Sequence, residues 1–277
     1  MPELPEVESV RQSLASLIVG DTILQSEVYL KKMVKAPTLK AFESSIQDQT
    51  IEAVHRRGKH LIIVLNDYHL LIHLRMEGKF FLSETIPEKM KHEHLRFHLK
   101  SGRTLSYHDV RTFGTFHLYS KRPYQDLPPL LKAGLEPFDE GFDGTYLKAK
   151  LKFRKAPIKA ALLDQTILLG LGNIYADEVL FEAGLHPLKK ASSLTLASYQ
   201  ALADASVNIL QKAVEAGGTL IRTYHNTLGV DGLFQQQLKV HTKVNQPCLT
   251  CHTIIERIKV SGRSTYFCPS CQARSKR

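Results

Sequence analysis

The stretch Cys248–Cys271 reads CLTCHTIIERIKVSGRSTYFCPSC and holds all four cysteines of the 277-residue chain. Cys248 and Cys251 form one C-x-x-C pair, and Cys268 and Cys271 form a second pair after a gap of sixteen residues. A two-residue spacer lets one tight turn present two thiolates to the same ion, and zinc binds four such ligands as a tetrahedron. The spacing therefore predicts one zinc ion held by Cys248, Cys251, Cys268 and Cys271. Because all four positions are filled by protein, this zinc would be structural rather than catalytic.

Two disulfides or four free thiols are the alternative use of these cysteines. Disulfides belong to oxidising compartments, but the N-terminal segment MPELPEVESV is acidic and lacks the basic region and apolar core of a secretory signal. No apolar run is long enough to cross a membrane. We therefore expect a soluble, cytoplasmic protein with no membrane partner and with zinc at the cysteines.

The chain is strongly basic, with a formal net charge of +10 and an isoelectric point near 9.4. Such an excess favours an anionic polymer as partner, and nucleic acid is the usual one. A merely basic globular protein is the alternative on charge alone. The length allows two domains, each with its own core.

Residues 1–120 predict an antiparallel β-sandwich with flanking helices. Pro5 suits the first turn of a helix in which Val7, Val10, Leu14 and Leu17 recur at helical spacing. Alternating apolar residues on both sides of Ser101-Gly102 predict a β-hairpin. Further strands are expected at 23–30, 51–55, 61–65, 70–74 and 80–82.

The second half changes from a period of two to one of about 3.6 residues. Residues 121–144 hold four prolines and three glycines and predict a linker. A helical domain is expected over 145–236, a zinc finger over 237–273 and a basic, frayed tail over 274–277. Helices are expected near 145–152, 157–164, 174–183 and 196–216, with Gly217-Gly218 ending the last one.

The N-terminal segment Met1-Pro2-Glu3-Leu4-Pro5-Glu6 carries a possible nucleophile. Methionine before a small residue is normally removed, which would leave Pro2 with a secondary amine. Such an amine condenses with a sugar C1′ to give an iminium ion, and its pKa is far below that of lysine. Glu3 and Glu6 lie within about a turn of it and can move protons or favour the helix start. The alternative is a capped helix terminus without catalytic function.

Six motifs in order closely resemble the formamidopyrimidine-DNA glycosylase family, and the resemblance covers essentially the whole chain. They are the start MPELPEVE, the run 56–59 (RRGK), the run 73–78 (HLRMEG), the run 109–114 (DVRTFG), the run 170–178 (GLGNIYADE) and the four-cysteine segment. The resemblance implies a two-domain α+β fold: an N-terminal β-sandwich, a helix–two-turn–helix domain and a zinc-finger hairpin, with DNA between the halves. It also implies a monomer that excises oxidised purines from duplex DNA and then cleaves the strand.

The resemblance also implies roles for single residues. Pro2 matches the nucleophile, Glu3 the general acid/base, and Glu6 a supporting group. Lys59 matches a proton donor for β-elimination that also contacts phosphate, with an ordinary solvated lysine as the alternative. Arg263, in the zinc hairpin, matches a residue that grips phosphates and aids δ-elimination.

A further set matches residues that hold the DNA. Phe113 would wedge between base pairs, Met76 would fill the gap left by an extruded base, and Arg111 would bond the orphaned cytosine. Core positions are the alternative for Met76 and Phe113. The loop 222–236 matches one that caps the lesion. The phosphate contacts implied are His92, Arg154, Lys159 and Asn173, of which Asn173 opens a helix behind two glycines.

Two other classes remain open from the residues. An endonuclease VIII-like enzyme for oxidised pyrimidines shares the proline, the glutamate and a zinc finger, but usually begins Glu-Gly-Pro-Glu. A non-catalytic zinc protein that binds DNA would have the same charge and cysteines. Two departures from the family, Gly-Leu-Glu-Pro at 134–137 and His241-Thr242 before the first zinc cysteine, touch no assigned catalytic group.

Overall fold

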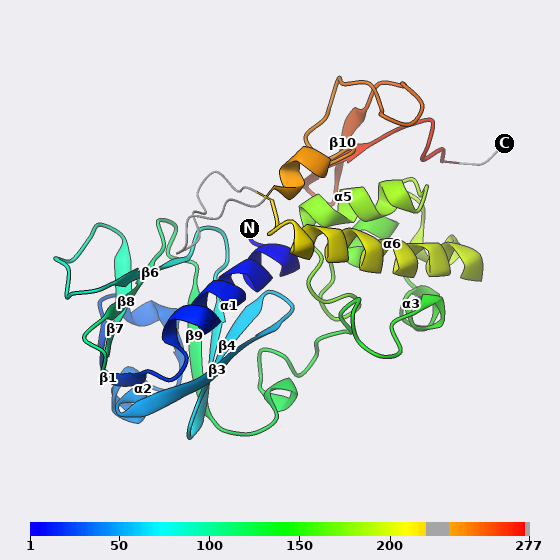
Figure 1. Ribbon diagram of the computed structural model, residues 1–277. Helices are drawn as coiled ribbons and strands as arrows, with labels where there is room; N and C mark the ends of the chain where they lie inside the picture. Colours follow the sequence, from blue (N-terminus) through cyan, green and yellow to red (C-terminus); the bar gives the residue numbers. More distant parts are fainter. Residues whose placement is uncertain (220–232, 275–277) are drawn as a thin grey trace. The chain divides into compact units, whose positions relative to one another are not determined.

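The computed structural model describes residues 1–219 and 233–274, and its contacts divide the chain into two compact units (Figure 1). The first unit contains residues 1–131 together with 217–219, and the second contains 132–216 together with 233–274. The fold class is the expected one: a mixed α+β chain with an N-terminal sheet, a helical domain and a cysteine-bearing hairpin. None of the helices in the described ranges combines the length and apolar character that crossing a membrane requires.

The first unit is built on nine strands joined in the order β2-β9-β5-β4-β3-β1-β7-β8-β6. Its elements are α1 (Leu4–Ile18), β1 (Thr22–Val28), η1 (Lys31–Met33), β2 (Val34–Ala36), α2 (Leu39–Ile46), β3 (Gln49–Arg57), β4 (His60–Leu65), β5 (Tyr68–His73), β6 (Lys79–Ser83), β7 (Glu93–Leu99), β8 (Thr104–His108), β9 (Thr115–Ser120) and η2 (Tyr124–Asp126). All neighbours pair antiparallel except β2 and β9, which run parallel.

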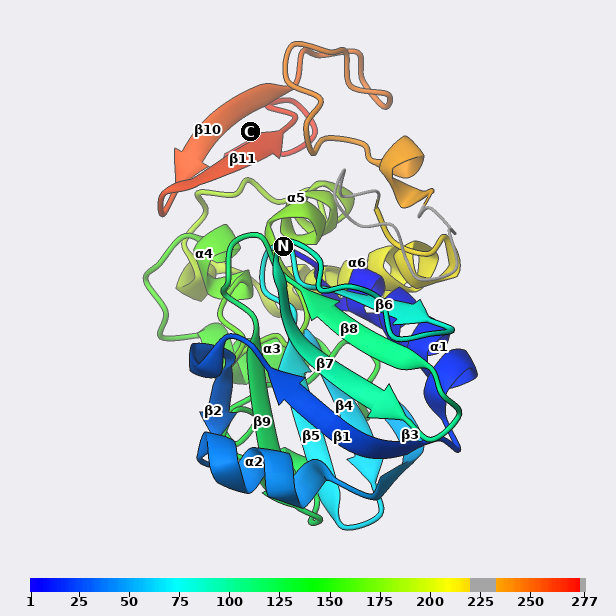
Figure 2. The same ribbon diagram turned by 90° about the vertical axis from the view of Figure 1, so that its left-hand side faces the viewer.

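The ladder folds into two layers because β1 belongs to both. It pairs with β3 over only two residue pairs, Thr22–Thr50 and Ile23–Gln49, and then pairs with β7 along most of its length. Figure 2 shows β1, β7 and β8 lying over β3, β4 and β5. Apolar side chains from both layers and from α1 form one core, to which α1 contributes Val7, Val10, Leu14 and Ile18.

Five elements of this unit lie outside the expected set: α2, β2, β9 and the short 3-10 helices η1 and η2. α2 is only eight residues long, and Phe42 and Ile46 are its two buried side chains. β9 alternates Phe116 and Leu118 inward, but its partners β5 and β2 are distant in the chain. The expected strands all appear within two residues of their predicted ends, and β3 is longer than predicted by two residues at each end.

The second unit is helical and ends in a hairpin. Its elements are α3 (Gly144–Leu151), α4 (Ile158–Leu162), α5 (Asn173–Glu182), η3 (Ala191–Ser193), α6 (Leu196–Glu215), η4 (Phe234–Gln237), β10 (Glu256–Val260) and β11 (Arg263–Phe267). Thr195 caps α6 by accepting a hydrogen bond from Ser198 N at 3.1 Å. Ser261 and Gly262 both have positive φ, which is the backbone of a tight two-residue hairpin turn.

Candidate functional site

The amino end of the chain lies among charged side chains of the first unit. Burial lowers the pKa of the Met1 amino group below its ordinary value, Glu3 and Glu6 oppose this shift, and Lys59 and Arg111 add to it. Pro2 and Glu3 are themselves buried. The charges of four predicted site residues therefore act on the amine at the chain terminus. A desolvated amine of lowered pKa is more often unprotonated, which is the form that attacks carbon.

Glu6 fixes this terminus with both of its carboxylate oxygens. Glu6 Oε2 accepts a hydrogen bond from Glu3 N at 2.8 Å, and Glu6 Oε1 accepts from Thr219 N at 2.8 Å and from Thr219 Oγ1 at 2.9 Å. Gly218 has positive φ, and a Cβ there would lie 2.9 Å from Glu6 Oε1. Ser9 Oγ also donates to Gly217 O at 2.8 Å. Glu6 thus joins the start of α1 to residues 217–219, and its geometry fits a supporting role.

Lys59 lies in the two-residue turn between β3 and β4, where Arg57 pairs with His60. Although a lysine in a turn is usually solvated, Lys59 is buried. Its neighbour His60 packs edge-on against His73, with ring centroids 4.7 Å apart. Burial lowers the pKa of His60 to about 4 and that of His73 well below its ordinary value. The two imidazoles beside Lys59 are therefore neutral at pH 7, and they add no competing positive charge.

Asp109 organises the turn that carries Arg111 and Phe113. Asp109 Oδ1 accepts from Arg111 N at 3.0 Å, and Asp109 Oδ2 accepts from Phe113 N at 2.9 Å and Gly114 N at 2.8 Å. The buried carboxylate thereby folds the turn so that Phe113 is 51% exposed, with the Arg111 guanidinium 5.0 Å from its ring centre. A core position for Phe113 is excluded. The sequence motifs assign no role to Asp109. An aspartate at the start of a turn is nevertheless typical, because its carboxylate accepts hydrogen bonds from the backbone N–H groups that follow.

Tyr107 lies between this turn and the one that carries Met76. A Cβ at Gly114 would lie 1.9 Å from Tyr107 Oη, and a Cβ at Gly78 would lie 2.0 Å from the same atom. The Met76 turn is closed by Gly78 N donating to Leu74 O at 3.1 Å, and Met76 is half-buried. The two glycines are therefore required so that both turns can pack against one buried tyrosine. This places Met76 and Phe113 on neighbouring turns.

His92 adjoins the turn that begins at Asp109. Its backbone has φ of 66°, and its carbonyl accepts a hydrogen bond from Asp109 N at 3.0 Å. It lines a cavity of about 200 Å³ together with Glu77, Lys79 and Asp109. His92 is half-buried, so its imidazole remains a candidate phosphate contact.

The four cysteines of the second unit meet the requirements of a zinc ion. Their sulfur atoms lie within 4.8 Å of one another, with separations of 3.4 Å (Cys251–Cys268), 3.4 Å (Cys251–Cys271) and 3.9 Å (Cys248–Cys271). A tetrahedron with zinc–sulfur bonds of about 2.3 Å has sulfur–sulfur edges of about 3.8 Å. Burial raises the pKa of both Cys268 and Cys271, whereas hydrogen bonding with Thr253 lowers that of Cys251 to about 6. Four thiolates this close together need a cation to balance their charge. The donor set and geometry fit one structural zinc with four cysteine ligands.

The hairpin beside the cysteines presents Arg263 at its tip. Arg263 is the first residue of β11, pairs with Val260, and is exposed. Within the second unit, Asn173 Nδ2 donates to Ser264 O at 3.1 Å. The residue next to Arg263 is thus held by the first residue of α5.

Lys159 has a different place from the one expected. It is 0% exposed, and its Nζ lies 2.7 Å from Asp177 Oδ1, donating also to Ser264 O at 3.0 Å and Thr265 Oγ1 at 2.8 Å. A side chain with no accessible surface does not contact a phosphate, so the expected phosphate contact by Lys159 is wrong. Its ammonium instead fastens β11 to α4 and α5.

Asp177 is the anion at the centre of this network. Its Oδ2 accepts from Tyr266 N at 3.3 Å and lies 2.8 Å from His241 Nδ1. Asp177 is fully buried among the apolar residues of α5, where a carboxylate needs a cationic or hydrogen-bonding partner. An aspartate within an apolar helical segment is therefore the sequence feature that could have identified Asp177 as a positioning residue.

The remaining expected contacts differ in exposure. Asn173 is half-buried, is the first residue of α5 and donates its amide to the hairpin. Arg154 is exposed, and its guanidinium lies 3.3 Å from Asp164 Oδ2. Residues 222–232 of the expected capping loop lie outside the described residues.

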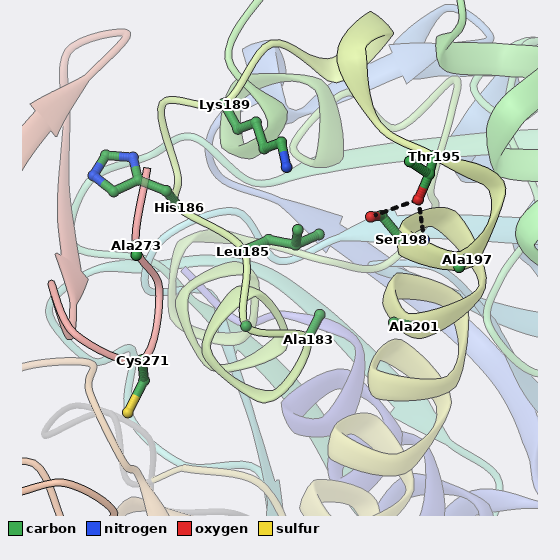
Figure 3. A pocket seen from close by; sticks show the side chains of 11 residues that line it. Ala183, Leu185, His186, Lys189, Thr195, Ala197, Ser198, Ala201, Cys271 and Ala273 are labelled. Carbon is green, nitrogen blue, oxygen red and sulfur yellow. Dashed lines mark hydrogen bonds between the residues drawn. The ribbon is translucent and has the colours of Figure 1, made fainter. Parts of the chain in front are cut away.

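A cavity of about 550 Å³ lies elsewhere in the second unit, between the end of α5 and the start of α6 (Figure 3). Its polar lining includes Lys189, Thr195 and Ser198, and its other walls are mostly small side chains. The hydroxyls of Thr195 and Ser198 bond each other at 3.0 Å as part of the helix cap. Among the described residues that line this cavity there is no carboxylate and no chain terminus.

Three family models match the chain in succession. The formamidopyrimidine-DNA glycosylase N-terminal domain matches residues 1–116, the formamidopyrimidine-DNA glycosylase H2TH domain matches 133–225, and a zinc finger found in FPG and IleRS matches 245–274.

Curated relatives and solved structures agree with these matches. Formamidopyrimidine-DNA glycosylase of Bacillus cereus is 46% identical over 275 residues, covering 99% of this chain and 100% of the relative. Wild-type Fpg of Lactococcus lactis in complex with N7-benzyl-Fapy-dG-containing DNA superposes with a TM-score of 0.91 at 42% identity, covering 98% of this chain and 100% of that one. The same enzyme in complex with oxidised-pyrimidine-containing DNA gives 0.90 at 41% identity, with the same coverage. The chain therefore belongs to the formamidopyrimidine-DNA glycosylase family.

Proposed function

We propose that this protein is a bifunctional DNA glycosylase and AP lyase of base excision repair, acting on oxidised purines in duplex DNA. The observation that carries this proposal is the buried amino end of the chain, where Pro2 and Glu3 are buried and the charges of Glu3, Glu6, Lys59 and Arg111 act on the terminal amine. An amine, a carboxylic acid and a buried lysine are the groups that imine formation and elimination need.

The nucleophile in this proposal is the secondary amine of Pro2, which exists only after Met1 has been removed. Its nitrogen attacks C1′ of the damaged nucleotide, a carbon–nitrogen bond forms, and the bond from C1′ to the base breaks. The N–H proton that the amine loses neutralises the departing base. Glu3 gives a proton to the opening sugar oxygen and afterwards accepts protons. The resulting iminium ion draws electrons from C2′, so that loss of a C2′ proton expels the 3′ phosphate in β-elimination.

Lys59 and Arg263 act on the phosphates during elimination. Lys59 is buried next to His60 and His73, whose lowered pKa keeps both imidazoles neutral at pH 7. No protonated imidazole therefore repels the Lys59 ammonium. Arg263 has an exposed guanidinium at a tight hairpin tip, and this planar group binds phosphate oxygens in a fork. A second elimination then releases the other phosphate.

The turns at 74–78 and 109–114 hold the DNA open. Phe113 is exposed and apolar, Met76 lies on the neighbouring turn, and the Arg111 guanidinium lies next to the Phe113 ring. An extruded base leaves a gap and an unpaired partner, which an apolar wedge and an arginine can fill and bond. His92, Arg154 and Asn173 remain proposed backbone contacts, and Lys159 is reassigned to positioning.

Borohydride trapping tests the covalent mechanism. Intact protein incubated with a duplex holding 8-oxoguanine opposite cytosine, then reduced, should give a stable protein–DNA adduct and a cleaved strand. Pro2→Gly should abolish the adduct, and the mass of active protein should lack Met1. An unchanged adduct with Pro2→Gly, or retained Met1 in active protein, contradicts the nucleophile.

The same assay separates the two alternatives. An endonuclease VIII-like enzyme would cleave thymine glycol in preference to 8-oxoguanine, and a non-catalytic zinc protein would bind DNA without any adduct. The complex of the Lactococcus lactis enzyme with oxidised-pyrimidine-containing DNA makes the thymine glycol arm necessary. We expect preference for 8-oxoguanine and a monomer in solution.

A further inference from the structure

The segment between α3 and α4 exposes an aromatic ring among cations. Phe153 is 83% exposed and lies between Lys152 and the pair Arg154 and Lys155. No aspartate or glutamate occurs from residue 144 to residue 160. The Lys152 ammonium lies 5.0 Å from the Phe153 ring centre.

Helix stability explains only part of this composition. Lys148 and Lys150 lie in the last turn of α3, where positive charge suits the helix dipole. Phe153 and Lys155 lie beyond the helix, and an exposed phenylalanine contributes no burial to the fold. Arg154 has one acidic neighbour, Asp164, at 3.3 Å. The ring and the cations beyond the helix therefore need another explanation.

The backbone beneath Phe153 is fixed rather than loose. Ser192 N donates to Arg154 O at 2.9 Å, and Ala191 N donates to Ala156 O at 3.0 Å. Pro157 and Lys190 form an antiparallel bridge, which places the exposed residue Lys190 beside the same segment. The ring is thus presented from a base ordered in advance, which lowers the entropic cost of stacking a ligand on it.

We propose that the Phe153 surface, defined as Lys150, Lys152, Phe153, Arg154, Lys155 and Lys190, binds single-stranded DNA next to the duplex on which the enzyme acts. The cations bind phosphates, and one base stacks on the exposed ring. Duplex DNA would use the cations but offers no unstacked base to the ring. The inference rests on the proposed function for its substrate. The surface shares Arg154 with the proposed duplex contacts but contains no residue assigned to catalysis.

Fluorescence anisotropy with a labelled 20-nucleotide oligothymidine tests the surface on the full-length, zinc-loaded protein. Phe153→Ala should weaken binding about fivefold or more, and Phe153→Trp should restore it. Changing Lys152, Lys155 and Lys190 together to alanine should flatten the slope of log affinity against log salt by about 2 units, since each lost phosphate contact contributes about 0.7.

Matched controls make the outcome decisive. Leu249 is another exposed apolar residue of the second unit, so Leu249→Ala should leave oligothymidine binding unchanged. Changing the exposed lysines Lys40, Lys100 and Lys132 to alanine removes the same charge elsewhere and should affect the slope less. Equal binding by wild type and Phe153→Ala, or equal slopes for the two triple variants, overturns the proposal.

Cleavage of a short, blunt 8-oxoguanine duplex separates this inference from the proposed function. Phe153→Ala should cleave it at the wild-type rate while losing affinity for oligothymidine. Loss of cleavage in Phe153→Ala would place the ring in the catalytic machinery and refute a separate single-strand surface. Wild-type protein that binds oligothymidine but does not cleave would refute the proposed function alone.

Discussion

Replacing Lys159 with methionine removes an ammonium from a site with no exposed surface while keeping a long side chain. The variant loses the 2.7 Å ion pair with Asp177 and the hydrogen bonds to Ser264 O and Thr265 Oγ1. Removing one partner of a buried ion pair costs roughly 3–5 kcal/mol, mainly because the other charge stays buried. Asp177 keeps Tyr266 N and the His241 ring as partners. We therefore expect a loss of about 3 kcal/mol in the free energy of unfolding.

Urea unfolding followed by circular dichroism measures this loss. A double variant, Lys159→Met with Asp177→Leu, removes both charges and should recover part of the stability, because no uncompensated charge remains. Lys212→Ala, an exposed lysine on α6, serves as control and should change the free energy of unfolding by no more than about 0.5 kcal/mol.

Salt dependence of DNA binding separates positioning from direct contact. A lysine bound to a phosphate of duplex DNA contributes about 0.9 to the slope of log affinity against log salt. Since Lys159 fastens the hairpin that carries Arg263, Lys159→Met should lower strand cleavage. A fall in that slope of about 0.9 with unchanged unfolding would refute the buried network and restore the phosphate contact.

Four other changes test separate parts of the structure. Asp109→Ala leaves three backbone N–H groups without their acceptor, so the free energy of unfolding should fall by about 2–4 kcal/mol. Cleavage assays should also show a weaker preference for cytosine opposite the lesion. Burial, then Arg75, lowers the pKa of His60 to about 4. Because the folded protein favours the neutral ring, the contribution of His60 to the free energy of unfolding is complete above about pH 6.5. It falls by roughly 3 kcal/mol as the pH is lowered toward 4. His60→Gln should therefore reduce the pH dependence in this range, measured by urea unfolding at a series of pH values. Cys268→Ser should lose zinc, measured by metal analysis, and lesion-DNA binding in gel shifts, while the unfolding transition of the first unit persists. Glu6→Gln should reduce borohydride trapping nearly as much as Glu6→Ala, because the new amide donor faces backbone N–H donors.

Local patterns in the sequence predict those elements of the fold that are long or strictly alternating. The β7–β8 hairpin is clear because its apolar residues alternate on both sides of a short Ser101-Gly102 turn. α2 spans only two turns, and a helical period is not recognisable over that length. β9 has too few alternating positions to be distinguished, and only its pairing with β5 and β2 makes it a strand. Tertiary pairing thus decides the elements that the sequence alone leaves open.

The site divides in the same way. The zinc ligands follow from spacing, because two C-x-x-C turns bring four sulfurs together whatever the rest of the chain does. Lys159 gives no such signal, since its burial depends on Asp177 and on Ser264, which is 105 residues away. Resemblance to the family assigns it to the DNA-binding set, but the contacts of its Nζ assign it to the hairpin. A matched position therefore predicts importance more securely than it predicts which atoms are touched.

A nucleophile at a chain terminus poses a physical problem, because terminal residues normally fray. The structure solves it with Glu6, whose two oxygens bind Glu3 N on one side and Thr219 on the other. The second contact lies at the end of the described segment 217–219, shortly before residues 222–236, which are the expected lesion-capping loop. Gly218 has to be glycine for this approach, since a Cβ would lie 2.9 Å from the carboxylate. One buried carboxylate thus ties the end of the chain that carries the proposed nucleophile to residues 217–219.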